Sequence, residues 1–184
     1  LRAALALLTQ DVIGPLPKDA ARLLVLARDN GERLVRLVND ILDFEQLRAG
    51  AMSIRFQTCN LVEVLHDSVR AVEATAQQAD VRVQLKVDDE SMSLPVAVDP
   101  RRLEQVLLNL LANAIQHTAR GGCVRMSVNV LSERVRVRIQ DEGAGVPADF
   151  LPRLFEPFAQ AGQGAGGHRR GTGLGLAISR DLMR

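Results

Sequence analysis

The sequence predicts an α+β protein, in which a helical hairpin precedes an α/β sandwich with a mixed sheet. In residues 1–49, apolar side chains recur every three or four positions, which is the period of helices. In residues 50–184, runs that alternate apolar and polar residues are interspersed with helical runs, as expected where helices cover one face of a sheet. We therefore divide the chain into two domains, 1–49 and 50–184.

The first domain has the pattern of two helices joined by a sharp break. Residues 1–13 resemble a helix end, and residues 14–17 contain a glycine and two prolines, which cannot continue a helical hydrogen-bond ladder. A long helix is expected from about Lys18 to Leu47. Its apolar stripe is as wide as a bundle seam and includes Leu23, Leu24, Ala27, Leu34, Leu37, Val38, Ile41, Leu42 and Phe44. One hairpin cannot bury this stripe, so we expect a homodimer whose two hairpins form a four-helix bundle.

Local signals mark the elements of the second domain. Asn60 and Glu63 resemble a capping box, and Asp99-Pro100 places an N-cap residue before a proline at the first helical position. Two glycines at 121–122 open a hairpin. The predicted elements are, in order, strand 52–56, helix 61–79, strand 81–87, strand 96–98, helix 100–117 and strands 124–130 and 135–139.

Composition excludes several classes of function. A net charge of +1 argues against a general nucleic-acid binder. Arg134, Arg136 and Arg138 share one face of a strand, which we interpret as a solvated sheet face in preference to an anion-binding surface. Cys59 and Cys123 lie far apart, which favours reduced thiols over a disulfide or metal site. The chain has no signal peptide and no apolar run of roughly 18 residues, so we expect a cytoplasmic segment.

Two asparagines on the helix at 100–117 are the first candidates for chemistry. Asn109 and Asn113 are four residues apart, so their side chains lie one above the other, on an arc that also holds Gln105 and Gln116. Asparagine is a mediocre helix former. The row is either a polar edge that faces solvent or a source of amide oxygens for Mg²⁺, which prefers oxygen ligands.

Two glycine-rich stretches follow. Asp141 begins the run 141–147, which is either a plain turn or a loop whose carboxylate accepts a hydrogen bond from an exocyclic amine such as that of adenine. Residues 171–178 are glycine-rich and enter a helix, where backbone N–H groups and the helix dipole favour phosphate. Before them, 161–167 is interpreted as a mobile flap, and 168–170 adds positive charge.

Taken in order, these motifs resemble those of two-component sensor histidine kinases, within the ATPase group that includes gyrase, Hsp90 and MutL. Residues 103–114 resemble the N box, 141–145 the G1 box, 154–158 the F box and 171–176 the G2 box, with 157–170 in the position of the ATP lid. The hairpin, with Ile41-Leu42-Asp43-Phe44, resembles the dimerisation and phosphotransfer region. The resemblance covers essentially the whole chain.

The resemblance implies Mg-ATP as the ligand and phosphoryl transfer as the reaction. Asn113 would hold Mg²⁺, Asp141 would recognise adenine, and Asn109 would assist at the phosphates. The γ-phosphoryl group would pass to a histidine and then to an aspartate of a response-regulator receiver domain. The implied ATP-binding residues are Asn109, Asn113, Gln116, His117, Asp141, Gly143, Gly145, Phe155, Arg169, Arg170, Gly171, Thr172, Gly173, Leu174, Gly175 and Leu176.

The sequence departs from the family pattern in three ways. No histidine of the chain lies in a phosphoacceptor box, so we expect the acceptor upstream of Leu1. Gln116 and His117 stand where the family often has a lysine and an aromatic residue, and Arg169 or Arg170 would supply the missing charge. The chain ends inside the helix after the G2 box, so the sandwich is expected to be incomplete at its C-terminal end. A membrane would enter only through other parts of a parent protein.

Two alternatives remain at the level of sequence. One is a nucleotide-sensing pseudokinase or scaffold with the same fold and no phosphotransfer, which Gln116 favours. The other is a gyrase-like or MutL-like ATPase that acts on DNA. The hairpin argues against this second alternative, as does Asn109, where those enzymes use a glutamate base.

Overall fold

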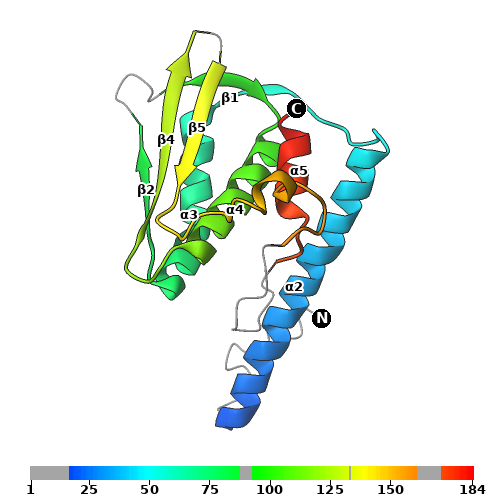
Figure 1. Ribbon diagram of the computed structural model, residues 1–184, viewed down its shortest axis with the longest axis vertical. Coiled ribbons are helices and arrows are strands. Elements are labelled where there is room, and N and C mark those ends of the chain that lie inside the picture. The colour runs from blue at the N-terminus through cyan, green and yellow to red at the C-terminus, as the bar shows by residue number, and fades with distance from the viewer. Residues whose placement is uncertain (1–16, 88–92, 133, 161–170) are drawn as a thin grey trace.

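The computed structural model describes residues 17–87, 93–132, 134–160 and 171–184. Its long helix α2 forms an arm beside a compact group of strands and helices (Figure 1). We call α2 the helical arm and the elements from β1 to α5 the sandwich. The elements are α2 (Lys18–Arg48), β1 (Gln57–Asn60), α3 (Leu61–Ala79), β2 (Arg82–Lys86), β3 (Pro95–Val98), α4 (Pro100–His117), β4 (Cys123–Leu131), β5 (Arg134–Gln140), the 3-10 turn η2 (Leu151–Arg153) and α5 (Gly175–Leu182). The predicted helix at 1–13 lies outside the described residues.

The main sheet has the order β2-β4-β5 and is mixed, as predicted. β2 pairs with β4 in parallel, with Val83 opposite Val124, whereas β4 and β5 form the predicted antiparallel hairpin, with Met126 opposite Ile139. β1 and β3 form a separate antiparallel pair. Together with the helices, this confirms the predicted fold class.

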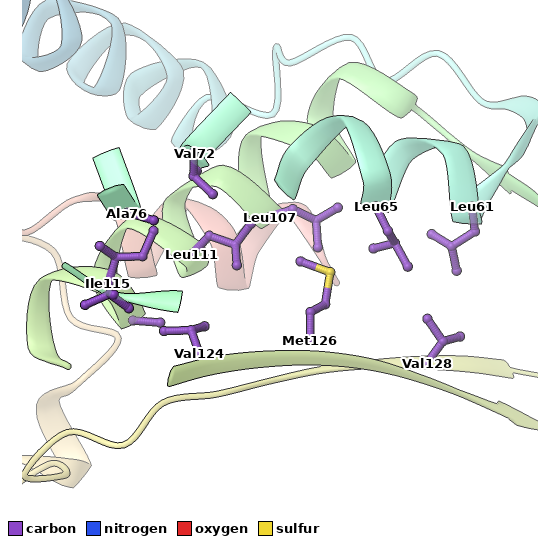
Figure 2. Close-up of a cluster of buried hydrophobic side chains, with 12 residues drawn as sticks. Leu61, Leu65, Val72, Ala76, Leu107, Leu111, Ile115, Val124, Met126 and Val128 are labelled. Carbon is purple, nitrogen blue, oxygen red and sulfur yellow. The ribbon is translucent and has the colours of Figure 1, made fainter. Parts of the chain in front are cut away.

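The core lies between one face of the main sheet and the helices α3 and α4 (Figure 2). Leu65 of α3, Leu111 of α4, and Val124 and Met126 of β4 are fully buried there. Burying such a side chain contributes about 1.5–3 kcal/mol. The opposite face of β5 carries its three arginines, which are exposed as predicted.

Side-chain caps begin α3 and α4, as their sequences predict. The Asn60 side chain accepts a hydrogen bond from the Val62 amide, and its own amide group donates to Glu63. This differs from a full capping box, in which the glutamate would accept from the backbone of the cap residue. Asp99 Oδ1 accepts from the backbone amides of Arg101 and Arg102.

The predicted strand at Met52–Phe56 is wrong. Residues 51–56 have no regular structure, and the strand is β1, at Gln57–Asn60. The partner strand β3 has four residues, all paired with β1, so no partner remains for residues 52–56. The Arg55 amide instead donates to Asp99 Oδ2, at 2.9 Å. Ile54 and Phe56 of this segment are exposed, Phe56 at 73%, and Met52 is half-buried.

The helical arm leaves much of its apolar stripe uncovered in a single copy of the chain. Its large apolar side chains with exposures from 39% to 68% are Leu23, Val25, Leu26, Leu34, Val35, Val38, Ile41 and Leu42. In contrast, Asp40, Asp43 and Phe44 are half-buried, because the C-terminal half of the arm lies against the sandwich.

Candidate functional site

The two asparagines of α4 have different surroundings. Asn109 is half-buried and donates from Nδ2 to Ser179 Oγ of α5, at 2.8 Å. Asn113, one turn later, is also half-buried, and its side chain makes no hydrogen bond within the part of the chain that the structure describes. Its amide oxygen is therefore available to a ligand.

The loop after β5 packs against the end of α4. The Gly143 amide donates to Asp141 Oδ1 at 2.8 Å, which closes a tight turn at the start of the loop. A Cβ atom on Gly143 would lie 2.5 Å from the carbonyl oxygen of His117, so only glycine permits this approach. Asp141 remains exposed, and its second carboxylate oxygen has no partner among the described residues.

The glycine-rich stretch at 171–176 leads into α5 beside Asn109. A Cβ atom on Gly175 would lie 2.1 Å from Asn109 Oδ1, so this glycine lets the start of α5 touch the asparagine. Leu174 is fully buried and fixes the start of the helix. The first amides of α5 have no intrahelical acceptor. Three motifs that are distant in the sequence thus meet around α4.

Comparisons with known proteins agree with this arrangement. Residues 98–184 match the family described as histidine kinase-, DNA gyrase B- and HSP90-like ATPase. The chain is 38% identical over 159 residues to the non-motile and phage-resistance protein of Caulobacter vibrioides, across 84% of this chain and 18% of that protein. It is 30% identical over 184 residues to the alginate biosynthesis sensor protein KinB of Pseudomonas aeruginosa, across 100% of this chain and 30% of that protein. The chain belongs to the sensor histidine kinase family.

A solved structure extends the likeness to the arm. Full-length ShkA in complex with AMPPNP superposes with a TM-score of 0.75 at 28% identity, across 98% of this chain and 37% of that one. The chain spans between about a fifth and a third of the length of these two curated relatives. We keep the names given by resemblance in the sequence analysis: N box for residues 103–114, G1 box for 141–145, F box for 154–158 and G2 box for 171–176.

Sequence reasoning missed how the G1 box is anchored. Glu142 accepts hydrogen bonds from Arg125 Nη2 at 2.7 Å and from the Cys123 amide at 3.0 Å. These two bonds, the arginine's first, hold the pKa of the Glu142 carboxyl below its usual range. Glu142 is thereby occupied in fixing the loop to β4, which leaves Asp141 as the accessible carboxylate. In the sequence, the only indication of this role was that Glu142 is an acidic residue next to Asp141.

The G2 box is fixed from two further sides. Gly173 has a φ of +73°, and a Cβ atom there would lie 2.8 Å from the backbone of Phe158, whose amide donates to the Gly173 carbonyl at 2.8 Å. Thr172 Oγ1 donates to Asp40 Oδ2 of the arm at 2.9 Å and accepts from the Leu174 amide at 3.2 Å. The G2 box therefore contacts the F box and the arm.

A second contact joins the arm to the N-box helix. Arg102 Nη1 donates to Asp43 Oδ1 at 3.0 Å, and Gln105 Nε2 donates to Asp43 Oδ2 at 2.7 Å. Nearby, the rings of Phe44 and Phe158 meet edge to face with centroids 6.3 Å apart. Gln105 belongs to the predicted polar row of α4, but its partner is the arm and not a ligand.

The remaining predicted site residues are less closely grouped. Gln116 and His117 are exposed at the end of α4, Gly145 is exposed with a φ of +75°, and Phe155 is 42% exposed. Arg169 and Arg170 lie outside the described residues. A cavity of about 420 Å³ adjoins the G2 box; it is lined by Arg153, Phe158, Ala159, Gln160 and Thr172.

The chemistry of the available donors suits Mg²⁺ bound together with phosphates. The described residues contain no group of three or more His, Cys, Asp or Glu side chains that could hold a metal ion alone. Asn113 offers one unused amide oxygen, and Mg²⁺ usually takes few protein ligands and completes its shell with water and phosphate oxygens. No described helix is both long and apolar enough to cross a membrane.

Proposed function

We propose that this chain is the ATP-binding core of a sensor histidine kinase and binds Mg-ATP between the N, G1 and G2 boxes. The observation that carries the proposal is the contact of Asn109 with both Gly175 and Ser179. It sets the asparagine row beside the first amides of α5, where phosphate is favoured by the helix dipole and by free N–H donors.

Each box would have a separate task. Asp141 would accept a hydrogen bond from the adenine amine through its second carboxylate oxygen. The amides at the start of α5 would bind phosphate oxygens, and Asn113 Oδ1 would hold Mg²⁺. The ion would neutralise charge on the phosphates during transfer. Catalysis of this kind depends on positioning and electrostatics more than on an acid or base.

The phosphoryl group would pass to a histidine outside this chain. His66 and His117 are exposed, on α3 and at the end of α4, and neither lies in a phosphoacceptor box. From the histidine the group would pass to an aspartate of a receiver domain. This reaction places the segment in the cytoplasm. We also propose that the exposed stripe of the arm pairs with a second copy, because a stripe of this width needs a partner helix pair.

Isothermal titration calorimetry tests the binding site. We expect the chain to bind Mg-ATP and Asn113→Ala to bind it at least ~10-fold more weakly, since a single metal ligand is lost. Asn129→Ala is the matched control, because Asn129 is an exposed asparagine of β4 on the outer sheet face. Equal affinities for wild type and Asn113→Ala would overturn the metal-ligand assignment.

A second function is favoured by Gln116, which is neutral where the family often carries a lysine. In that case the chain senses nucleotide without transferring phosphate. Incubation of the full-length parent with ATP separates the two. Acid-labile phosphate supports the kinase, whereas nucleotide binding without acid-labile phosphate supports the sensing module.

A further inference from the structure

We propose that docking of the helical arm and binding of the nucleotide weaken each other at the G2 box, because Asp40 of the arm accepts the hydroxyl proton of Thr172. The inference rests on the proposed binding of Mg-ATP. It goes further by assigning to α2 a direct, unfavourable effect on nucleotide affinity.

The contact between Thr172 and Asp40 uses a hydroxyl donor that lies beside the proposed phosphate site. The Thr172 hydroxyl has one proton, which it gives to Asp40 Oδ2, while its oxygen accepts from the Leu174 amide. With the arm docked, this hydroxyl cannot donate to a phosphate oxygen. The Asp40 carboxylate also adds negative charge beside a loop whose amides and helix dipole favour an anion.

The arm docks as a unit. Asp40, Asp43 and Phe44 are spaced by three and four residues, so they lie on one side of α2. They contact the G2 box, the N-box helix and the F box in turn. α5 lies between α4 and the arm (Figure 1). Loss of any one contact therefore favours release of the arm from all three boxes.

Docking carries an electrostatic cost that release would remove. Burial raises the pKa of the Asp40 carboxyl, and the nearby Asp43 raises it further, against the lowering effects of the Thr172 hydrogen bond and Arg36. The raised pKa means that the docked arrangement disfavours the charged carboxylate. Because coupling between two binding events is reciprocal, a nucleotide that is opposed by the arm must also weaken its docking.

If Asp40 instead favoured nucleotide binding, its removal would change the nucleotide affinity in the opposite direction. If Asp40 ordered the G2 box for nucleotide, removal of its charge would weaken binding. We expect Asp40→Asn, which keeps an acceptor for Thr172 but removes the charge, to bind Mg-ATP about 5-fold more tightly or better, at the lower end of coupling between sites. Glu45→Gln removes the same charge from an exposed position of the same helix and should leave the affinity unchanged.

A tryptophan on the arm reports docking independently of calorimetry. The chain has no tryptophan, so Phe44→Trp provides a single fluorophore against Phe158. In that background, Asp43→Asn should shift the emission to the red without nucleotide, because the indole loses its contact with the sandwich. Saturating Mg-ATP should also shift the emission of the Phe44→Trp variant to the red.

The outcomes separate this inference from the proposed function. Tighter binding by Asp40→Asn, with a red shift on addition of Mg-ATP, supports the mutual weakening of arm docking and nucleotide binding. Binding by wild type with equal or weaker binding by Asp40→Asn overturns the inference alone. Absence of nucleotide binding in every variant overturns the proposed function and the inference with it, while a red shift in Asp43→Asn would still establish the docked arm.

Discussion

Asn109 of the N-box helix donates a hydrogen bond to the buried hydroxyl of Ser179, which ties α4 to α5 across 70 positions of sequence. The same asparagine touches Gly175 at the first turn of α5. One side chain therefore sets the distance between the proposed metal site and the proposed phosphate site.

Ser179→Ala should reduce both stability and affinity. The variant leaves the Asn109 amide without its partner, at a cost of about 1–3 kcal/mol in the free energy of unfolding. Mg-ATP affinity should fall as well, because Asn109 is no longer held toward α5. Urea denaturation and calorimetry measure the two effects. Ser127→Ala, on the outer sheet face, is the control; equal losses in both variants would show that the Asn109 bond has no special role.

Gly175→Ala should destabilise the sandwich more than Gly171→Ala. The new methyl group at position 175 would lie 2.1 Å from Asn109 Oδ1, whereas at position 171 the nearest atom is the Gly173 amide nitrogen, 3.9 Å away. Overpacking of this kind costs about 1–3 kcal/mol. Thermal unfolding of the two variants compares them directly, and similar melting temperatures would contradict the close contact.

The loss of stability caused by Asp99→Asn should become smaller as the pH falls. A backbone hydrogen bond from Arg55 is the main cause that lowers the pKa of the Asp99 carboxyl in the folded chain. A lowered pKa gives stability that is complete above the ordinary value of 3.8 and is lost as the pH falls through the folded-state value. Wild type should therefore be more stable than Asp99→Asn at pH 6, and the two should converge toward pH 2.

The comparison with Asp99→Ala isolates the contribution of the N-cap hydrogen bonds to stability. Alanine also removes the acceptor for the first amides of α4, which costs about 1 kcal/mol more. Chemical denaturation at pH 6 should rank wild type above Asp99→Asn and Asp99→Asn above Asp99→Ala. A difference between wild type and Asp99→Asn that is constant from pH 6 to pH 2 would contradict the role of the charge.

Leu34→Glu should prevent dimerisation. Leu34 is 58% exposed within the apolar stripe of the arm, and a buried glutamate in a helix bundle has no compensating partner there. Sedimentation velocity should give a dimer for wild type and a monomer for Leu34→Glu. Gln46→Glu adds the same charge at an exposed polar position and should remain a dimer. A monomeric wild type would contradict the proposed bundle.

The sequence predicted the elements best where local chemistry and periodicity agree. The bounds of α3 and α4 follow from Asn60 and from Asp99-Pro100, and β4 and β5 follow from alternation around a turn. The strand predicted at Met52–Phe56 failed because alternation cannot tell how long the partner strand is. That limit is set by β3, whose four residues pair with β1 about 40 positions earlier.

The site was predicted as a set of motifs, but not as a set of contacts. The two glycine-rich runs were predicted as a turn or adenine loop and as a phosphate-binding helix start, whereas the structure shows that Gly143 and Gly175 also allow close approaches within the chain. The partners that they approach, His117 and Asn109, were also named. The roles of Asp40, Asp43 and Glu142 were missed, because a carboxylate on a polar helix edge or in a turn has no distinguishing pattern before its partner is known.

The bond between Asp40 and Thr172 joins residues 132 positions apart, and this has a consequence for how the protein is made. Ribosomes add about 5–20 residues per second, so Thr172 emerges on the order of 10 s after Asp40. The arm is thus the first described element to leave the ribosome, and its bond with the G2 box cannot form until Thr172 has followed. During that interval its uncovered leucines and valines are accessible to another nascent arm or to a chaperone.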